Sequence, residues 1–188
     1  MNYPEYPKIR FDRIPDLSIV YKCGGNKFTG AFSKYIEKFP YDPPPTHTFL
    51  HIENGLCMNV GIFTSLEKIE DILLKSKQYF VMTFTDLTEE QTREGKKYAY
   101  LQTGGKKQRF RLYDWRGYLY FGLRYIPGLN RLLKPSKRDP FCSDLVIDLF
   151  HSINHAALDK VDDEKTSPAK LFMLLENYPT VITREIIF

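Results

Sequence analysis

The chain has 188 residues, 43% of them hydrophobic and 15% aromatic, and a formal net charge of +4. This composition excludes a disordered chain and is typical of one domain with its own core. No apolar run approaches the roughly 18 residues that a membrane span needs, and the first residues lack the basic and apolar regions of a secretory signal. The three cysteines are scattered and form no CxxC pair. We therefore expect a reducing compartment, no disulfide framework, and no metal or cofactor.

The first half of the chain alternates between strand-like and short helical patterns. Asn-Gly is a strong signal for a tight reversal between two strands, because both residues tolerate positive φ. In chain order we expect a strand over residues 17–22, a short helix over 29–39, and two strands over 46–52 and 56–62 that meet at Asn54-Gly55.

The register of this hairpin decides which polar side chains meet. A two-residue loop would pair Asn59 with Leu50 and place it on the face opposite His47. A three-residue loop with a bulge at Gly55 pairs Asn59 with Phe49 instead, diagonal to His47. We favour the second register because it gathers the polar side chains on one face: His47, His51, Cys57 and Asn59.

The second half of the chain gives clearer helix boundaries. Thr88 and Gln91 have the spacing of a capping box, and Gly104-Gly105 would stop the helix that follows. In chain order we expect helices over 65–76 and 89–102 with a strand over 79–85 between them. We expect a further helix to begin at Cys142. It is followed by a short helix from Ser167 to Asn177 and a last strand over 181–188.

Residues 106–138 form a basic, aromatic segment. Ten Lys and Arg residues stand against the single acid Asp114, and seven aromatic residues lie between them. Basic residues beside stackable rings can bind single-stranded nucleic acid, and they can also bind an anionic membrane surface. The alternative is a solvated flap whose rings pack on the core. We expect an insertion here that contacts an anionic partner or is such a flap.

Cys142 has the position of an activated thiol. Asp139 is a good N-cap and Pro140 fits a first helical turn, so Cys142 lies at the start of a helix with a regular apolar stripe. The positive end of the helix dipole and its unsatisfied N–H groups lower the pKa of a thiol there. The alternative is that Cys142 is only the first core residue of the stripe.

A cysteine hydrolase also needs an imidazole to relay the proton and a polar group to orient it. His47 and Asn59, on neighbouring strands, could supply these groups to Cys142. A second pair, His51 with Cys57, could be another dyad or two metal ligands. Cys57 would then lie in mid-strand, without the helix end that activates Cys142.

Four stretches carry a resemblance to a known family: 16–22, 32–36, 46–55 and 141–146. In this order they resemble the circularly permuted NlpC/P60 group of papain-like cysteine hydrolases, in particular its YiiX-like members, over roughly residues 15–155. More distantly they are similar to the lecithin:retinol acyltransferase-like group. The most specific stretch is the Cys-Ser-Asp-Leu-Val run, where Asp144 replaces the usual Glu.

The resemblance implies roles for individual residues. Cys142 would be the nucleophile, His47 the base and Asn59 the third group, at a position where many such proteins carry Glu. Asn59 can accept the imidazole N–H, but it has no charge to stabilise an imidazolium. Tyr113, which precedes Asp114, would be part of a pocket wall.

The implied fold is α+β and papain-like, with an antiparallel sheet packed against the helix that begins at Cys142. We expect one domain with its core at 15–155, an insertion at 106–138, and a C-terminal helix and tail at 159–188. The expected function is cysteine-dependent hydrolysis or acyl transfer at the amide or ester bond of a peptide, cell-wall or lipid-like acyl substrate. The expected location is the cytoplasm or a viral or phage particle. The alternative is a non-catalytic binding or structural module that uses 106–138.

Overall fold

The computed structural model describes residues 1–24, 34, 38–60, 64–73, 78–104, 142–159, 161 and 166–187. Most of the helix expected over 29–39 lies outside the described residues. The basic segment 106–138, with Tyr113, and the expected cap residues Asp139 and Pro140 also lie outside them.

A single seven-stranded sheet organises the described part of the chain, in the order β1-β7-β6-β2-β3-β4-β5. Most neighbouring strands are antiparallel. Only β1 and β7 among the described strands pair in parallel, and the strands that carry His47 and Asn59 pair antiparallel, as expected. A parallel pair needs a long connection, and here nearly the whole chain lies between the two strands. The strands are β1 (Lys8–Arg10), β2 (Ser18–Cys23), β3 (Pro45–Glu53), β4 (Leu56–Val60), β5 (Thr64–Lys68), β6 (Gln78–Phe84) and β7 (Val181–Ile187).

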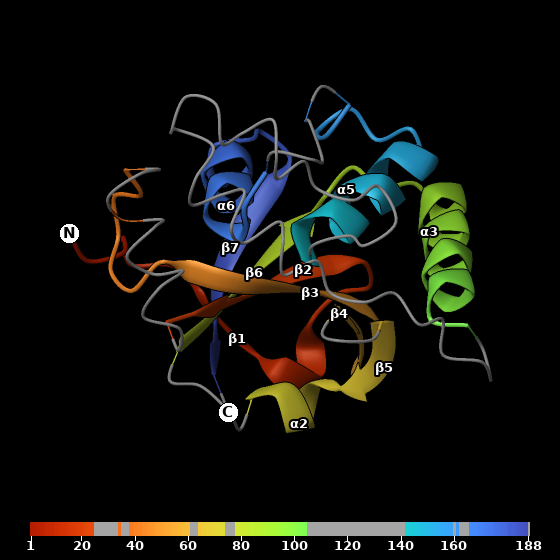
Figure 1. The fold of residues 1–188 in the computed structure, drawn as a ribbon, viewed down its shortest axis with the longest axis horizontal. Helices are drawn as coiled ribbons and strands as arrows, with labels where there is room; N and C mark the ends of the chain where they lie inside the picture. Colours follow the sequence, from red (N-terminus) through yellow and green to blue (C-terminus); the bar gives the residue numbers. More distant parts are fainter. Residues whose placement is uncertain are drawn as a thin grey trace, which may run out of the picture.

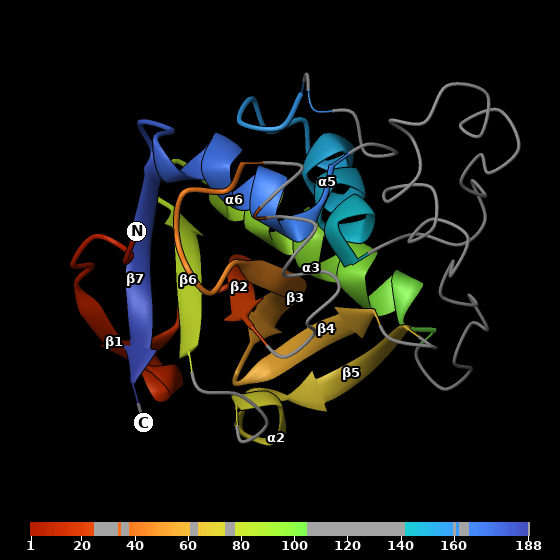
Figure 2. The same cartoon turned by 60° about the vertical axis from the view of Figure 1, so that its left-hand side comes forward.

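The described helices cover the two faces of this sheet unequally. Helices α3, α5 and α6 lie together on one face, and the short α2 lies on the other (Figures 1 and 2). Among the described residues, no helix combines the length and apolar character that crossing a membrane requires. The helices are α2 (Ile69–Leu73), α3 (Glu89–Gln102), α5 (Cys142–Ser152) and α6 (Pro168–Glu176), and a 3-10 turn spans Phe11–Arg13. The described fold is therefore α+β.

Side chains of the central strands point alternately to the two faces of the sheet, and this divides the core in two. One cluster joins β2, β3 and β6 to the three helices, and its largest fully buried aromatic members are Tyr21, Phe80, Phe150 and Phe172. The second cluster lies on the opposite face, between the sheet and α2, and includes Phe49 and Cys57. Neighbouring residues of a strand point to opposite faces, so each central strand contributes to both cores.

The helix starts follow the sequence signals. The Thr88 hydroxyl accepts from the Gln91 backbone N–H at 3.1 Å, and the Gln91 side chain accepts from the Thr88 N–H at 3.1 Å, so the capping box of α3 is confirmed. Ser167 caps α6 through the Lys170 N–H, with Pro168 in the first turn. Both caps satisfy backbone donors that have no partner within the helix.

The helix expected over residues 65–76 is wrong in its first third. Residues Thr64–Lys68 form strand β5, and α2 begins only at Ile69. Leu66 pairs with Met58 of β4, and the Ile69 N–H donates to the Gly55 carbonyl at 2.7 Å. Pairing with β4 satisfies backbone groups that would otherwise be left open at that strand, and it overrides the local helical spacing.

The hairpin register is confirmed, although the turn differs from the expected one. Asn59 pairs with Phe49, and His51 pairs with Cys57. Asn54 and Gly55 both have positive φ, 49° and 72°, as a two-residue turn of this kind requires. The extra residue is accommodated in β3 near Ile52, where the pairing shifts, rather than at Gly55.

Candidate thiol site at the start of helix α5

Cys142 is the first residue of α5, and it is buried, with 2% of its surface exposed. The Cys142 side chain lies between the start of α5 and strand β3 of the sheet. Unsatisfied N–H groups of a first helical turn stabilise a negative charge. The apolar stripe behind Cys142, including Leu145, Val146 and Leu149, is buried and fixes the helix against the sheet.

The Cys142 thiol and the His47 imidazole lie close enough that each changes the pKa of the other. Burial raises the pKa of Cys142, but the charge of His47 and the nearby polar groups of His47 and Thr48 outweigh burial and lower this pKa to about 7. Burial lowers the pKa of His47, but the charge and polar contact of Cys142 and the hydrogen bond with Asn59 raise it above its usual value. Both shifts favour a thiolate–imidazolium pair near neutral pH.

The other side of the His47 ring is held by Asn59. His47 Nε2 lies 2.9 Å from Asn59 Oδ1, and the ring makes an edge-on contact with Phe49 at a centroid distance of 4.6 Å. Because an amide oxygen only accepts, Nε2 carries the proton in this contact, and Nδ1 remains for the thiol. The structure thus brings together all three residues that the sequence singled out.

Sequence reasoning missed a fourth polar residue, Glu67. Asn59 Nδ2 donates to Glu67 Oε1 at 2.7 Å, and the Ser65 hydroxyl donates to the same oxygen at 3.0 Å. Both partners lie on β5, the strand that the sequence analysis took for part of a helix. Reading 64–68 as a third strand of the meander would have placed Ser65 and Glu67 beside Asn59.

Two buried hydroxyl groups near the thiol were also missed. Thr48 lies close enough to Cys142 to help lower the thiol pKa, but its hydroxyl makes no hydrogen bond of normal geometry with the described residues. Tyr21 lies directly across from Thr48 in the β2–β3 pairing. Its side chain is fully buried, and its hydroxyl has no hydrogen-bonding partner in the described part of the chain. The charge of Cys142 adds to burial in raising the pKa of Tyr21. The nearest sequence signal is strand alternation, since residue 48 shares the helix-facing side of β3 with Leu50 and Ile52.

The alternative pair, His51 and Cys57, has a different environment. His51 Nδ1 lies 2.9 Å from the Pro15 carbonyl, and the Gly55 N–H donates to His51 Nε2 at 3.2 Å. Both ring nitrogens therefore hold backbone groups, and burial lowers the pKa of this imidazole. Burial, followed by the charge of Glu67, raises the pKa of the Cys57 thiol to about 12. Neither group is poised for nucleophilic chemistry.

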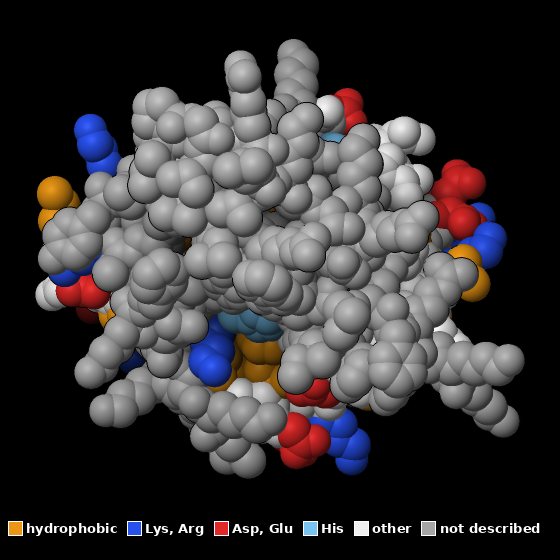
Figure 3. Space-filling view, viewed as in Figure 1, with side chains coloured by type: hydrophobic (Ala, Val, Ile, Leu, Met, Phe, Trp, Pro, Cys, Tyr) orange, Lys and Arg blue, Asp and Glu red, His pale blue; other side chains and the backbone are white. Residues whose placement is uncertain are grey.

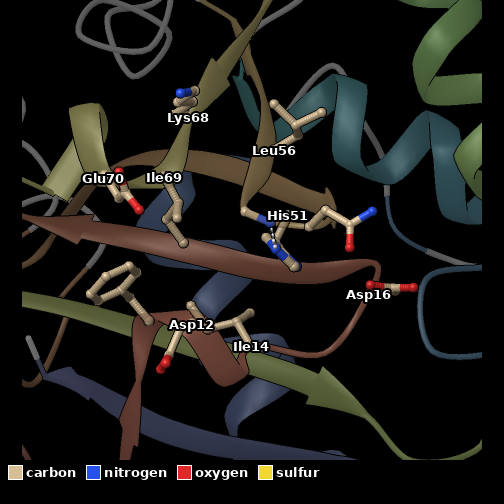
Figure 4. Close-up of a pocket in the computed structure, with 11 residues that line it drawn as sticks. Asp12, Ile14, Asp16, His51, Leu56, Lys68, Ile69 and Glu70 are labelled. Carbon is tan, nitrogen blue, oxygen red and sulfur yellow. Dashed lines mark hydrogen bonds between the residues drawn. The ribbon is translucent and has the colours of Figure 1, made fainter.

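His51 also borders a cavity of about 450 Å³. Asp12, Ile14, Asp16 and Ile69 surround the same space (Figure 4). The cavity does not include Cys142 or His47 among its lining residues.

On the face viewed in Figure 3, a histidine lies in a hollow beside hydrophobic and basic side chains. Tyr113 and the basic segment 106–138 fall outside the described residues, so the structure does not place the expected pocket wall or the expected contact with an anionic partner.

Comparison with known proteins bears on the fold. No family model matches the chain, and no curated protein matches its sequence. The structure is similar to the crystal structure of metalloprotein YiiX from Escherichia coli O157:H7, with a TM-score of 0.56 over 90% of this chain and 96% of that chain. The two sequences are 13% identical, and the likeness concerns the fold alone.

The neighbour is described as a metalloprotein, which raises the question of a metal site here. Within the described ranges, no group of three or more His, Cys, Asp or Glu side chains is arranged to hold a metal ion. The Asn59 amide oxygen already accepts from His47, so it is not a free third ligand beside Cys142 and His47. The described donor set does not fit a metal, and we derive no step through one. The chain therefore has an α+β fold similar to that of YiiX, with a thiol–imidazole–amide arrangement at the start of α5.

Proposed function

We propose that this protein is a cysteine-dependent hydrolase or acyltransferase that acts on an amide or ester bond, on a circularly permuted papain-like fold. The observation that carries the proposal is the shared environment of Cys142 and His47, in which the thiol pKa falls to about 7 despite full burial. A buried thiol without such a partner has a raised pKa, as Cys23 and Cys57 have. Perturbed groups of this kind concentrate at reactive sites.

The first half of the reaction follows from the protonation states. The Cys142 thiolate attacks the carbonyl carbon of the substrate, and a C–S bond forms. The tetrahedral intermediate then expels the amine or alcohol, which takes the proton from the His47 imidazolium as the C–N or C–O bond breaks. The product of this step is a thioester on Cys142.

The second half returns the enzyme to its starting state. Water, or an acceptor hydroxyl or amine, attacks the thioester carbonyl while the neutral His47 takes its proton. The C–S bond breaks, and the thiolate and imidazolium are restored. Asn59 holds the ring in the tautomer that this exchange needs. The Cys142 backbone N–H, at the helix start, is the expected donor to the developing oxyanion.

Mass spectrometry with p-nitrophenyl acetate as the probe tests this function. We expect a burst of about one equivalent of p-nitrophenol and an acetyl group on the Cys142 peptide. The variant Cys142→Ser should lose the burst, and the matched variant Cys57→Ser should keep it. Acetylation of Cys57, or a burst that survives Cys142→Ser, would overturn the proposal.

A further inference from the structure

We propose that Glu67 is a positioning residue of the thiol site, acting on His47 through the Asn59 side chain. This inference rests on the proposed function, because it assigns a role within the same reaction. Glu67 contacts neither Cys142 nor His47 in the hydrogen bonds of the described residues. Its effect must therefore pass through the amide of Asn59.

Strand pairing fixes the position of this carboxylate. In the β4–β5 ladder Asn59 lies opposite Ser65, and Glu67 is two residues further along β5, diagonal to Asn59 on the same face. The Ser65 hydroxyl donates to the Glu67 oxygen that also receives the Asn59 amide, at 3.0 and 2.7 Å. Half-burial of Glu67 and these two donors hold the carboxylate in one place.

The first consequence is the orientation of the Asn59 amide. An ionised carboxylate accepts hydrogen bonds and donates none, so it binds the NH₂ end of the amide. The carbonyl end is then turned toward His47, as the 2.9 Å contact requires. If the amide were reversed, its NH₂ group would face Nε2 and favour the imidazole tautomer with the proton on Nδ1. That tautomer cannot accept a proton from the thiol.

The second consequence is electrostatic. Asn59 itself brings no charge to the imidazolium, whereas Glu67 places a carboxylate behind the amide. A charge-assisted hydrogen bond polarises the amide and strengthens its carbonyl as an acceptor. The chain His47–Asn59–Glu67 thus supplies a negative charge where a direct His–carboxylate contact is missing.

Alkylation of Cys142 by iodoacetamide, followed as a function of pH by peptide mapping, tests this role. In Glu67→Ala we expect alkylation at pH 6.5 to slow roughly tenfold, because the inflection of the pH profile moves up by about one unit. Glu67→Gln keeps the shape and an acceptor oxygen, and we expect it to recover part of the loss. The matched control is Glu70→Gln, which removes a carboxylate from the exposed start of α2 and should leave the profile unchanged.

The tautomer of His47 gives an independent readout that folding defects alone would not mimic. In long-range ¹⁵N spectra of the ¹⁵N-histidine-labelled protein, inactivated as Cys142→Ser, we expect the proton of neutral His47 on Nε2. Adding Glu67→Ala or Glu67→Gln should shift the population toward Nδ1. An unchanged tautomer and pH profile in both Glu67 variants would overturn the role of Glu67. A wild-type Cys142 that titrates like a free thiol, near pH 8.5, would instead overturn the proposed function.

Discussion

The β3–β4 hairpin carries two histidines, and each has a cysteine partner of opposite character. His51 pairs directly across from Cys57, whose thiol pKa is raised to about 12. His47, four residues earlier on the same strand, meets Cys142, whose thiol pKa is lowered to about 7. Both thiols are almost completely buried. Burial therefore does not explain the difference.

The difference lies in what the imidazole is left to do. Both ring nitrogens of His51 hydrogen-bond to backbone groups, the Pro15 carbonyl and the Gly55 N–H. One ring nitrogen of His47 hydrogen-bonds to Asn59, and the other is available to the thiol. Cys142 also lies at a helix start, whereas Cys57 is in mid-strand. A histidine next to a cysteine becomes a base only when a neighbour orients the ring without consuming its second nitrogen.

Substitution of His47 by alanine is the strongest test of this contrast. In His47→Ala the burial of Cys142 remains while its main stabilising charge is lost, so the thiol pKa should rise above its usual value. Alkylation at pH 6.5 should slow by roughly 10²-fold. Competition labelling against Cys57 in the same sample measures this ratio. Equal labelling rates before and after the substitution would show that His47 does not activate the thiol.

Much of the architecture could be predicted from local signals, because those signals act within a few residues. The capping box at Thr88, the Ser167-Pro168 start and the Asn54-Gly55 turn each have their own chemistry in the sequence. The hairpin register followed from grouping polar side chains. This register brought His47 and Asn59 together before any tertiary information was used.

What could not be predicted depends on partners distant in sequence. Strand β1 is only three residues long, and it is a strand because β7, at the other end of the chain, pairs with it. Strand β5 has helical spacing, and only the open edge of β4 makes it extended. With β5 misread, Glu67 could not be placed next to Asn59. Tyr21 belonged to the strand expected over 17–22, and only the packing of α5 against the sheet puts it near the thiol.

Removing the His51 ring should affect stability and leave the thiol untouched. His51→Leu would leave the Pro15 carbonyl and the Gly55 N–H without their partner, at a cost of about 2–3 kcal/mol in the free energy of unfolding. Because the folded-state pKa of His51 is lowered, its neutral form favours folding above the ordinary histidine pKa of about 6.5, and this contribution is lost as pH falls below it. Urea denaturation at pH 7.5 and 5.5 measures both effects. A changed alkylation profile of Cys142 would contradict the separation of the two pairs.

The smallest expected effect comes from the ion pairs that hold the His51 end of the hairpin to helix α3. Lys96 Nζ lies 2.6 Å from Asp16 Oδ2 and 2.8 Å from Glu53 Oε2, and Tyr100 donates to the other Glu53 oxygen at 2.8 Å. All of these groups are partly exposed to solvent, so solvent screening limits the gain. Lys96→Met, which keeps the aliphatic stem, should lower the free energy of unfolding by about 0.5–1 kcal/mol at pH 7.

The pH dependence identifies the cause of this loss. Hydrogen bonds from Lys96 and Tyr100 lower the pKa of Glu53, so the stabilisation is present above the unfolded-state pKa of about 4.3 and is lost as pH falls through the folded-state value. The difference between wild type and Lys96→Met should therefore shrink in acid, whereas a packing defect would persist there. Alkylation of Cys142 at pH 6.5 should be the same in both proteins. A slower reaction in Lys96→Met would mean that the two ends of the hairpin are coupled, and that the contrast between its histidines is not purely local.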